Sequence, residues 1–239
     1  TYSWSGDEQH ANDLRKKIGT LLETPNFYHY LSAEKNLRIA AMIKGRGEGD
    51  IEKVLRIVNL YERKDSKFNT FSLGMKQRLA IASALLGDPE ILVFDEPTNG
   101  LDPAGIAEIR ELIKDLYKQG KTIIMASHLL DEVEKVCTHA AILKTGNLIM
   151  TGNVEEIMMD EDVVELSAAD ITALLTVLQT LGKEVLVDEK ANTVQIIFPK
   201  GTAKMADINQ HCFNNGVVLT QLVLRKKRLE ARFFELTNN

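Results

Sequence analysis

The fold of this chain is decided by two neighbouring stretches, Phe71-Ser72-Leu73-Gly74-Met75-Lys76-Gln77-Arg78 and Ile91-Leu92-Val93-Phe94-Asp95-Glu96-Pro97-Thr98-Asn99-Gly100-Leu101-Asp102-Pro103. Between them, apolar and small residues recur at helical spacing as far as Leu86, and Gly87-Asp88-Pro89 ends the run. The sequence therefore predicts a loop, a helix, a strand and a second loop. Ser72 and Gly74 precede the helix, where unpaired backbone N–H groups and the helix dipole favour a bound anion.

The predicted strand from Ile91 to Phe94 is an unbroken apolar run that ends in two carboxylates, Asp95 and Glu96. Such a run is typical of a strand buried on both faces of a parallel sheet, which carries its polar chemistry at the carboxyl end. Adjacent side chains of a strand point to opposite sides, so we expect the two carboxylates to have different tasks. One would lie near a hydrated Mg²⁺ while the other faces an attacking water.

These motifs resemble the signature motif and the Walker B motif of an ATP-binding cassette (ABC) ATPase, with Ser72 to Lys76 in place of the usual LSGGQ. Asn99-Gly100-Leu101-Asp102 is similar to the D-loop of the family. His128 follows an apolar run from Thr122 to Ala126 and stands where the family has its switch histidine. The resemblance covers about residues 1–160. It implies an α/β fold, with a P-loop NTPase-like ABC ATPase core that is N-terminally incomplete and a helical subdomain at about residues 26–88.

The resemblance implies a site for ATP that is shared between two ABC ATPase subunits paired head to tail, as a homodimer or a heterodimer. Asp102 would contact the opposite subunit near the nucleotide, and it also precedes Pro103 as the expected N-cap of the next helix. The two roles of Asp102 are compatible. The residues that would touch the nucleotide held by the opposite chain are Ser72, Leu73, Gly74 and Met75.

Three further residues take their expected roles from the resemblance. Asp95 would organise Mg²⁺, and Glu96 would polarise the attacking water. His128 would hydrogen-bond the γ-phosphate and that water, a positioning task more than a proton transfer. The alternative for His128 is a structural role, which is usual for a lone histidine after a strand.

A carboxylate, Glu23, ends an expected strand that starts at Ile18, before Thr24-Pro25. The resemblance places the Q-loop of the family here, with glutamate in place of glutamine, as in bacterial exporter ATPases of lantibiotic and bacitracin systems. A carboxylate can approach Mg²⁺ but cannot donate a hydrogen bond as an amide does. The alternative is a solvated strand end.

The segment from Ser32 to Phe68 has helical patterns on both sides of a glycine-rich break, Gly45 to Gly49. We expect one helix from Ser32 through Ile43 and another that starts at Asp50 or Ile51. The break is not interpreted as a phosphate loop, because it lacks a Gly-Lys-Ser/Thr ending and a preceding strand. In the family this helical subdomain faces the membrane partner.

A complete ABC ATPase carries its phosphate-binding Gly-x-x-x-x-Gly-Lys-Ser/Thr loop upstream of the Q-loop, and this sequence begins too late to contain it. Gly120-Lys121-Thr122 does not qualify, because it lies between a helix and a strand, the reverse of the order that aims N–H groups at phosphate. We expect a truncated sequence or a partial gene product; the alternative is a protein that naturally lacks the loop. The chain alone is expected to bind little or no ATP. We also expect the loss to remove a partner of the Walker B strand and leave buried ladder groups unpaired.

After about residue 160 the pattern changes to strand, helix, strand, strand, helix, strand, which predicts a small ferredoxin-like α+β unit over residues 161–239. A final helix is expected from Glu230 to Leu236. No constellation of catalytic residues stands out in this C-terminal accessory domain. A regulatory, dimerising or docking role is expected.

Composition limits the possible partners and the location. The net charge of −5 and the pI of about 5.6 argue against a nucleic-acid binder that neutralises phosphates, and Arg225 to Arg228 is read as a solvated helix start. Cys137 and Cys212 are expected to be reduced thiols in a cytosolic protein. The longest apolar run is far short of the ~20 residues of a membrane span, so any membrane role is expected to be peripheral. The resemblance implies a place on the inner face of the cell membrane.

The sequence is thus interpreted as the ATP-hydrolysing subunit of an ABC transporter that powers export through an integral-membrane permease, with antimicrobial peptides as the cargo that the resemblance around Glu23 implies. The alternative is a degenerate, non-hydrolytic cassette that lends Ser72 to the site of an intact partner. DNA-repair ABC ATPases are disfavoured because the segment from Glu23 to Ser72 is too short for their coiled coil. Translation ABC ATPases usually carry two cassettes in one chain.

Overall fold

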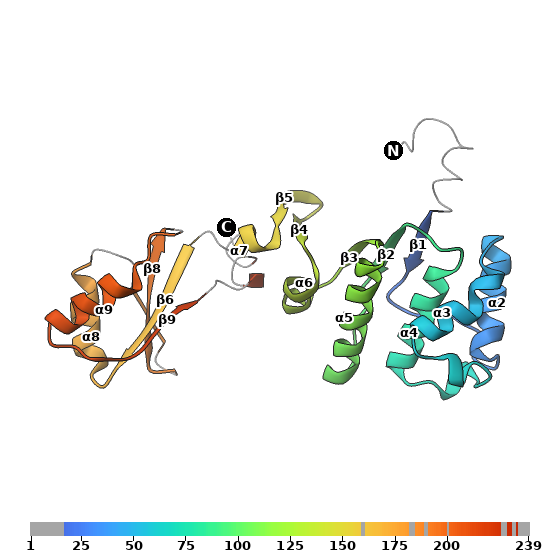
Figure 1. Cartoon of the computed structure of the whole chain (residues 1–239), viewed down its shortest axis with the longest axis horizontal. Helices are drawn as coiled ribbons and strands as arrows, with labels where there is room; N and C mark the ends of the chain where they lie inside the picture. Colours follow the sequence, from blue (N-terminus) through green and yellow to red (C-terminus); the bar gives the residue numbers. More distant parts are fainter. Residues whose placement is uncertain are drawn as a thin grey trace. The chain divides into compact units, whose positions relative to one another are not determined.

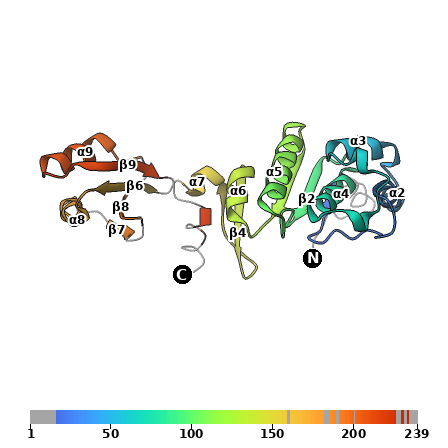
Figure 2. The ribbon, with the colours of Figure 1, turned by 90° about the horizontal axis from the view of Figure 1, so that it is seen from below.

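The computed structural model describes residues 17–158, 161–181, 185–188, 191–199, 201–225, 229–230 and 233. The chain forms two compact units, Thr1–Glu132 and Val133–Asn239, which are blue to green and green to red in Figures 1 and 2. A short strand expected within residues 1–12 lies outside the described residues, as does most of the helix expected to end at Leu236.

The N-terminal unit is built on a parallel sheet, as the apolar runs predicted. Its register aligns Ile18 with Ile91 and Phe94 with Met125, so the carboxyl ends of all three strands meet at one edge. The strand order is β1-β2-β3. The strands are β1 (Ile18–Leu21), β2 (Ile91–Asp95) and β3 (Thr122–Ala126).

Two expectations about this sheet are wrong. The Walker B strand β2 was expected to lack a neighbour, but it lies in the centre and pairs with β1 and β3. The strand Thr122–Ala126 was expected to be buried, yet 58% of Ile124 is exposed. The reason is position: β3 is the outermost strand of the described sheet, and α5 (Pro103–Lys118) packs against it, so that alternate side chains remain outside the core.

The helices of this unit start and end where the sequence predicted. Ser32 caps α2 (Ala33–Lys44) by accepting a hydrogen bond from the backbone N–H of Lys35, and Gly45 ends the helix in the left-handed conformation (φ 65°). The glycine-rich break is confirmed. The other elements of the segment are η1 (Glu48–Asp50), α3 (Ile51–Ile57), η2 (Tyr61–Arg63) and η3 (Phe68–Thr70).

The helix α4 (Leu73–Leu85) is the central helix of the unit. It has buried residues all around it and packs against β1, α2, α3 and α5. The contact with β1 is between backbones: a Cβ atom added at Gly19 would lie 2.2 Å from the carbonyl oxygen of Ala84. The buried residues of α4 are Gln77, Leu79, Ala80, Ile81, Ala82, Ala84 and Leu85.

An aromatic cluster joins the segment after β1 to the segment before α4. Phe68 is 1% exposed, and its ring centroid lies 5.3 Å from that of Phe27, 5.6 Å from that of His29 and 6.2 Å from that of Phe71. Backbone hydrogen bonds accompany the rings, since the N–H of Phe68 donates to the carbonyl oxygen of Leu31. The two segments therefore form one packed layer.

A β-hairpin lies near the start of the C-terminal unit. Thr145 and Gly146 both have positive φ values, 49° and 82°, as the tight turn of a two-residue hairpin requires. The elements around the turn are α6 (Leu130–Val136), β4 (His139–Lys144), β5 (Asn147–Asn153) and α7 (Val154–Met158).

The rest of this unit is an antiparallel sheet with the strand order β7-β8-β6-β9, and two helices pack on it. Counted from the start of the unit, this is the order 2-3-1-4 of a ferredoxin-like βαββαβ fold, which confirms the predicted topology. The elements are β6 (Glu161–Ala168), α8 (Ile171–Gln179), β7 (Val185–Asp188), β8 (Thr193–Pro199), α9 (Met205–Asn214) and β9 (Leu219–Arg225).

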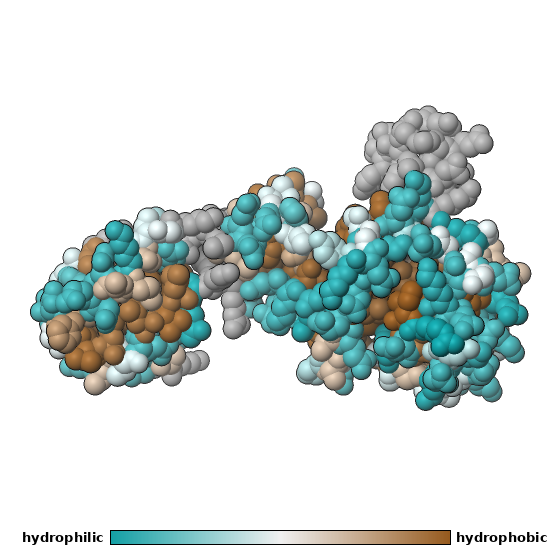
Figure 3. Space-filling model, viewed as in Figure 1, coloured by the Kyte–Doolittle hydropathy of each residue, from teal (hydrophilic) through white to brown (hydrophobic). Residues whose placement is uncertain are grey.

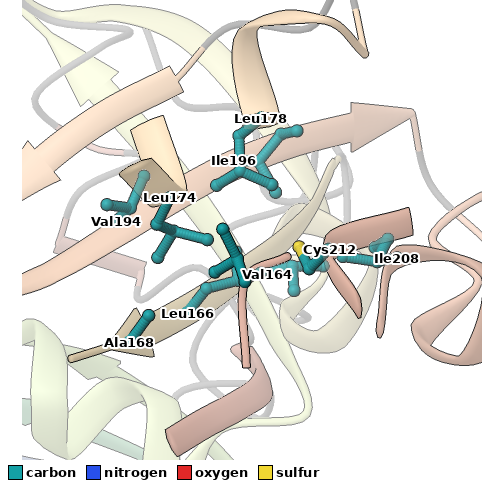
Figure 4. Packing of buried hydrophobic residues seen from close by; sticks show 10 residues of the cluster. Val164, Leu166, Ala168, Leu174, Leu178, Val194, Ile196, Ile208 and Cys212 are labelled. Carbon is teal, nitrogen blue, oxygen red and sulfur yellow. The ribbon is translucent and has the colours of Figure 1, made fainter. Parts of the chain in front are cut away.

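Side chains from one face of this sheet and from both helices form a separate apolar core (Figure 4). Leu174 of α8 and Cys212 of α9 are fully buried there, against Val164 of β6 and Ile196 of β8. Both cysteines of the chain are free thiols, and burial raises the pKa of each.

The outer surface is mixed in character. On the face displayed in Figure 3, hydrophilic residues cover much of each unit, with hydrophobic patches between them. Among the described helices, none combines the length and the apolar character that a membrane span requires.

Candidate functional site

The candidate site lies at the edge where the parallel strands end. After β2, the backbone N–H of Glu96 donates to the carbonyl oxygen of Ala126 at 3.0 Å, which extends the pairing with β3 by one residue. Glu96 itself has a φ of 47°, a conformation that non-glycine residues rarely adopt. The chain then turns, and the N–H of Asn99 donates to the carbonyl oxygen of Glu96 at 3.1 Å. The turn fixes Glu96 at the edge of the sheet.

Glu96 and His128 form a close pair at this edge. The backbone N–H of His128 donates to Glu96 Oε1 at 2.9 Å, and the ring Nδ1 of His128 lies 2.9 Å from Oε2. An ionised carboxylate only accepts, so Nδ1 carries the proton and Nε2 stays available for another group. The glutamate side chain is 20% exposed and the histidine side chain 59%. The structure thus joins two residues that lie 32 positions apart in the sequence.

Asp95 is the last residue of β2 and is exposed. Its neighbour Glu96 is largely shielded and engaged with His128. The two carboxylates therefore have different surroundings, as their adjacent positions at a strand end predicted.

Glu23 lies beyond the end of β1, and the structure brings it to the turn after β2. The side-chain Nδ2 of Asn99 donates to Glu23 Oε1 at 2.8 Å, and both residues are exposed. Glu23 is thus exposed near the end of a strand, as the alternative expected, and it also accepts a hydrogen bond from Asn99.

The start of α4 lies against the same turn. Ser72 is the N-cap of the helix, with its Oγ accepting from the backbone N–H of Met75 at 3.3 Å. A Cβ atom at Gly100 would lie 3.3 Å from Leu73 Cδ2, and one at Gly74 would meet Leu101 Cδ2 at 4.0 Å. Gly74 thus leaves its side of the helix start open to a close approach by another group.

Asp102 ends the turn and caps α5. Its Oδ1 accepts from the backbone N–H of Gly105 at 2.8 Å, and Pro103 occupies the first position of the helix. The capping role predicted for Asp102 is confirmed.

The sequence of this chain is similar to those of known proteins. Residues 3–99 match the family described as ABC transporter. The chain is 32% identical over 232 residues to the bacitracin transport ATP-binding protein BcrA of Enterococcus faecalis, an alignment that covers 96% of this chain and 75% of that protein. It is also 39% identical over 168 residues to the lantibiotic transport ATP-binding protein SrtF of Streptococcus pyogenes, covering 68% of this chain and 73% of that protein. The chain belongs to the ABC transporter ATP-binding proteins.

The fold of this ABC ATPase subunit agrees with that assignment. A solved structure of cbiO1 from Clostridium perfringens, described as part of the ABC transporter complex cbiONQ, superposes with a TM-score of 0.57 at 31% identity. The superposition covers 63% of this chain and 62% of that one. The expected α/β cassette fold and the expected resemblance to bacitracin and lantibiotic exporter ATPases are both confirmed.

The side chains at the strand ends suit a magnesium nucleotide. Glu23 and Asp95 are exposed carboxylates of the type that Mg²⁺ prefers. In the part of the chain that the structure describes, no three His, Cys, Asp or Glu side chains form a metal cluster. Protein sites for Mg²⁺ commonly use one or two carboxylates together with substrate phosphates and water, so this donor set fits the ion.

Asn99 was not singled out as a candidate site residue in the sequence analysis. Asn99 was quoted as part of the D-loop, but its bonds to Glu23 and to Glu96 were not expected. The available signal was chemical: a side-chain amide three residues after Glu96, at the same sheet edge as Glu23, can donate a hydrogen bond to a carboxylate there.

Proposed function

We propose that this ABC ATPase subunit hydrolyses ATP with Mg²⁺ and thereby powers export through an integral-membrane permease, with antimicrobial peptides as the class of cargo. The observation that carries the proposal is the Glu96–His128 pair at the carboxyl edge of a parallel sheet. The cargo class is supported by the similarity to bacitracin and lantibiotic transport proteins and by the glutamate at position 23.

The nucleotide would supply the phosphoryl group, and its magnesium ion would neutralise charge on the phosphate oxygens. Asp95 would hold the ion, with Glu23 as a second carboxylate within the same edge of the sheet. Ser72, Leu73, Gly74 and Met75 would present the open start of α4 to the nucleotide of a second subunit, with Asp102 at the same interface. Backbone N–H groups at a helix start favour such an anion.

Glu96 would polarise the attacking water, and His128 would position it. In this structure the main-chain and ring nitrogens of His128 occupy both oxygens of Glu96. Each carboxylate oxygen has a second lone pair, so Glu96 can accept a hydrogen bond from water while both contacts with His128 remain. If His128 keeps Nδ1 on Glu96, only the doubly protonated ring can also donate from Nε2 to a phosphate oxygen.

The location and the domain roles follow from the same proposal. Two subunits would pair head to tail on the inner face of the cell membrane, and the helical subdomain at residues 26–88 would face the permease. We place the functional cassette in residues 1–160 and an accessory domain without a nucleic-acid role in residues 161–239.

A glutamine substitution at Glu96 tests the proposal. We expect Glu96→Gln to lower turnover of ATP by about 10²–10⁴-fold, the usual contribution of a general base, while ATP binding is retained. The measurement compares ATP binding and hydrolysis, with Mg²⁺, in this chain and in the product of its complete reading frame.

Glu90→Gln is the matched control, because Glu90 immediately precedes β2 at its opposite end, where it pairs with Lys17. Its turnover should stay near that of the unaltered protein. If Glu96→Gln hydrolyses ATP as fast as the control, the assigned site is wrong. If the unaltered protein does not hydrolyse ATP and Glu96→Gln leaves the activity of a partner cassette unchanged, the non-hydrolytic alternative is correct.

A further inference from the structure

One turn touches the ends of two strands and the start of a helix in the N-terminal unit. The backbone N–H of Asn99 donates to the carbonyl oxygen of Glu96, and its side chain donates to Glu23 Oε1. The next residue, Gly100, lies against Leu73 at the start of α4. Asn99 is therefore bonded at once to the two glutamates to which the proposed function gives chemical roles.

We propose that Asn99 is a positioning residue, which holds the Glu23 carboxylate against the turn that carries Glu96. The inference rests on the proposed ATPase function. It goes beyond that function because it names Asn99, a residue that takes no part in the reaction itself, as the residue that orients Glu23.

The chemistry of the pair is matched to a glutamate. Both oxygens of an ionised carboxylate only accept, so the hydrogen must come from residue 99. An asparagine amide supplies it at 2.8 Å, a length typical of a hydrogen bond to a charged group. An acceptor at residue 99 would instead repel Glu23 and separate the two loops.

The exposure of both residues predicts which property the bond controls. A hydrogen bond between solvated groups adds little to stability, because water replaces it when it breaks. Its effect is on geometry, and small displacements at a reacting centre lower rates strongly. We therefore expect changes at Asn99 to alter turnover while the midpoint of thermal unfolding stays the same.

The contact itself can be tested in the 239-residue chain without any nucleotide. The side-chain NH₂ signals of Asn99 in a ¹H–¹⁵N spectrum are assigned by their loss in Asn99→Asp. We expect Glu23→Ala to shift these signals and Glu48→Ala to leave them in place, since Glu48 is an exposed carboxylate of η1. Signals that do not respond to Glu23→Ala overturn the proposal.

The positioning role is tested by exchanging donor and acceptor in the product of the complete reading frame. Asn99→Asp should lower kcat for ATP by about 10- to 100-fold, with KM nearly unchanged. In the double variant Glu23→Gln/Asn99→Asp the glutamine amide can donate to the aspartate, so kcat should return to the level of Glu23→Gln alone. Asn69→Asp, the same change at an exposed site, should have no effect.

The outcomes separate the two proposals. Losses that simply multiply in the double variant overturn the positioning role. An unaltered protein without ATPase activity overturns the proposed function, whereas the signals of Asn99 still decide whether the contact with Glu23 exists.

Discussion

Lys44 is a largely buried amine in the last turn of α2. Its Nζ donates to the backbone carbonyl oxygen of Ser83 in α4. Burial first, and then the nearby charge of Arg46, together lower the pKa of Lys44 from 10.5 to about 8. Lys44 thus links α2 to α4 by a hydrogen bond, but at neutral pH its charged amine is partly removed from water, which is unfavourable.

This pKa predicts how stability changes with pH. The folded protein releases the Lys44 proton near pH 8, whereas the unfolded chain holds it until about pH 10.5. Between these values the unfolded state binds more protons, so the contribution of Lys44 to the free energy of unfolding rises with pH. Lys44→Met should raise that free energy at pH 7 by about 1–2 kcal/mol, after allowance for the partial exposure of the amine.

Urea denaturation at pH 7 and pH 10 measures the effect. The gain from Lys44→Met should shrink at pH 10, because the wild-type amine is then neutral when folded. Lys35→Met, the same change on the exposed side of α2, serves as the control and should give no such trend. An equal gain at both pH values would contradict the burial of the Lys44 charge.

At the scale of elements, the aromatic cluster around Phe68 couples the loop that carries Glu23 to the start of α4. Phe68→Ala should lower the free energy of unfolding by about 3–5 kcal/mol, the usual cost of emptying a buried aromatic site. Phe213→Ala removes a ring that is 65% exposed and should cost less than about 0.5 kcal/mol. Chemical denaturation of the two variants provides the comparison. Equal costs would show that the cluster does not stabilise the fold.

The elements themselves were largely predictable, because their signals are local. Ser32, Gly45 and Pro103 mark helix ends through backbone geometry that one or two residues determine. The burial of β3 was not predictable from its apolar run, since exposure depends on which layers cover the strand.

The contacts of the site were predictable only in part, for a similar reason. That Asp95 and Glu96 lie at a sheet edge follows from the strand before them. The Glu96–His128 pair and the Glu23–Asn99 bond join residues 32 and 76 positions apart. No periodic pattern specifies such pairs, so their geometry had to come from the three-dimensional register of the strands.

For the whole molecule, the two compact units have separate apolar cores. Leu174 is fully buried in the C-terminal core, and Leu79 is fully buried in α4 of the N-terminal unit. Each leucine-to-alanine change should cost about 2–5 kcal/mol in its own unit. We expect calorimetry to resolve two transitions, with Leu174→Ala lowering one and Leu79→Ala lowering the other. A single transition that both changes lower equally would contradict separate cores.

The backbone contact between Gly19 and Ala84 fixes how one end of α4 lies on the sheet. A helix of 13 residues is a rod of roughly 20 Å, at 1.5 Å per residue. Gly19 contacts α4 near its C-terminal end, at the backbone of Ala84, where only a hydrogen atom of Gly19 fits between the strand and the helix. A methyl group at Gly19 would push the end of α4 at Ala84 away from β1. The opposite end of the helix, at Ser72, would then tilt. We therefore expect the lack of a side chain at Gly19 to determine the angle at which the start of α4 is presented to a bound group.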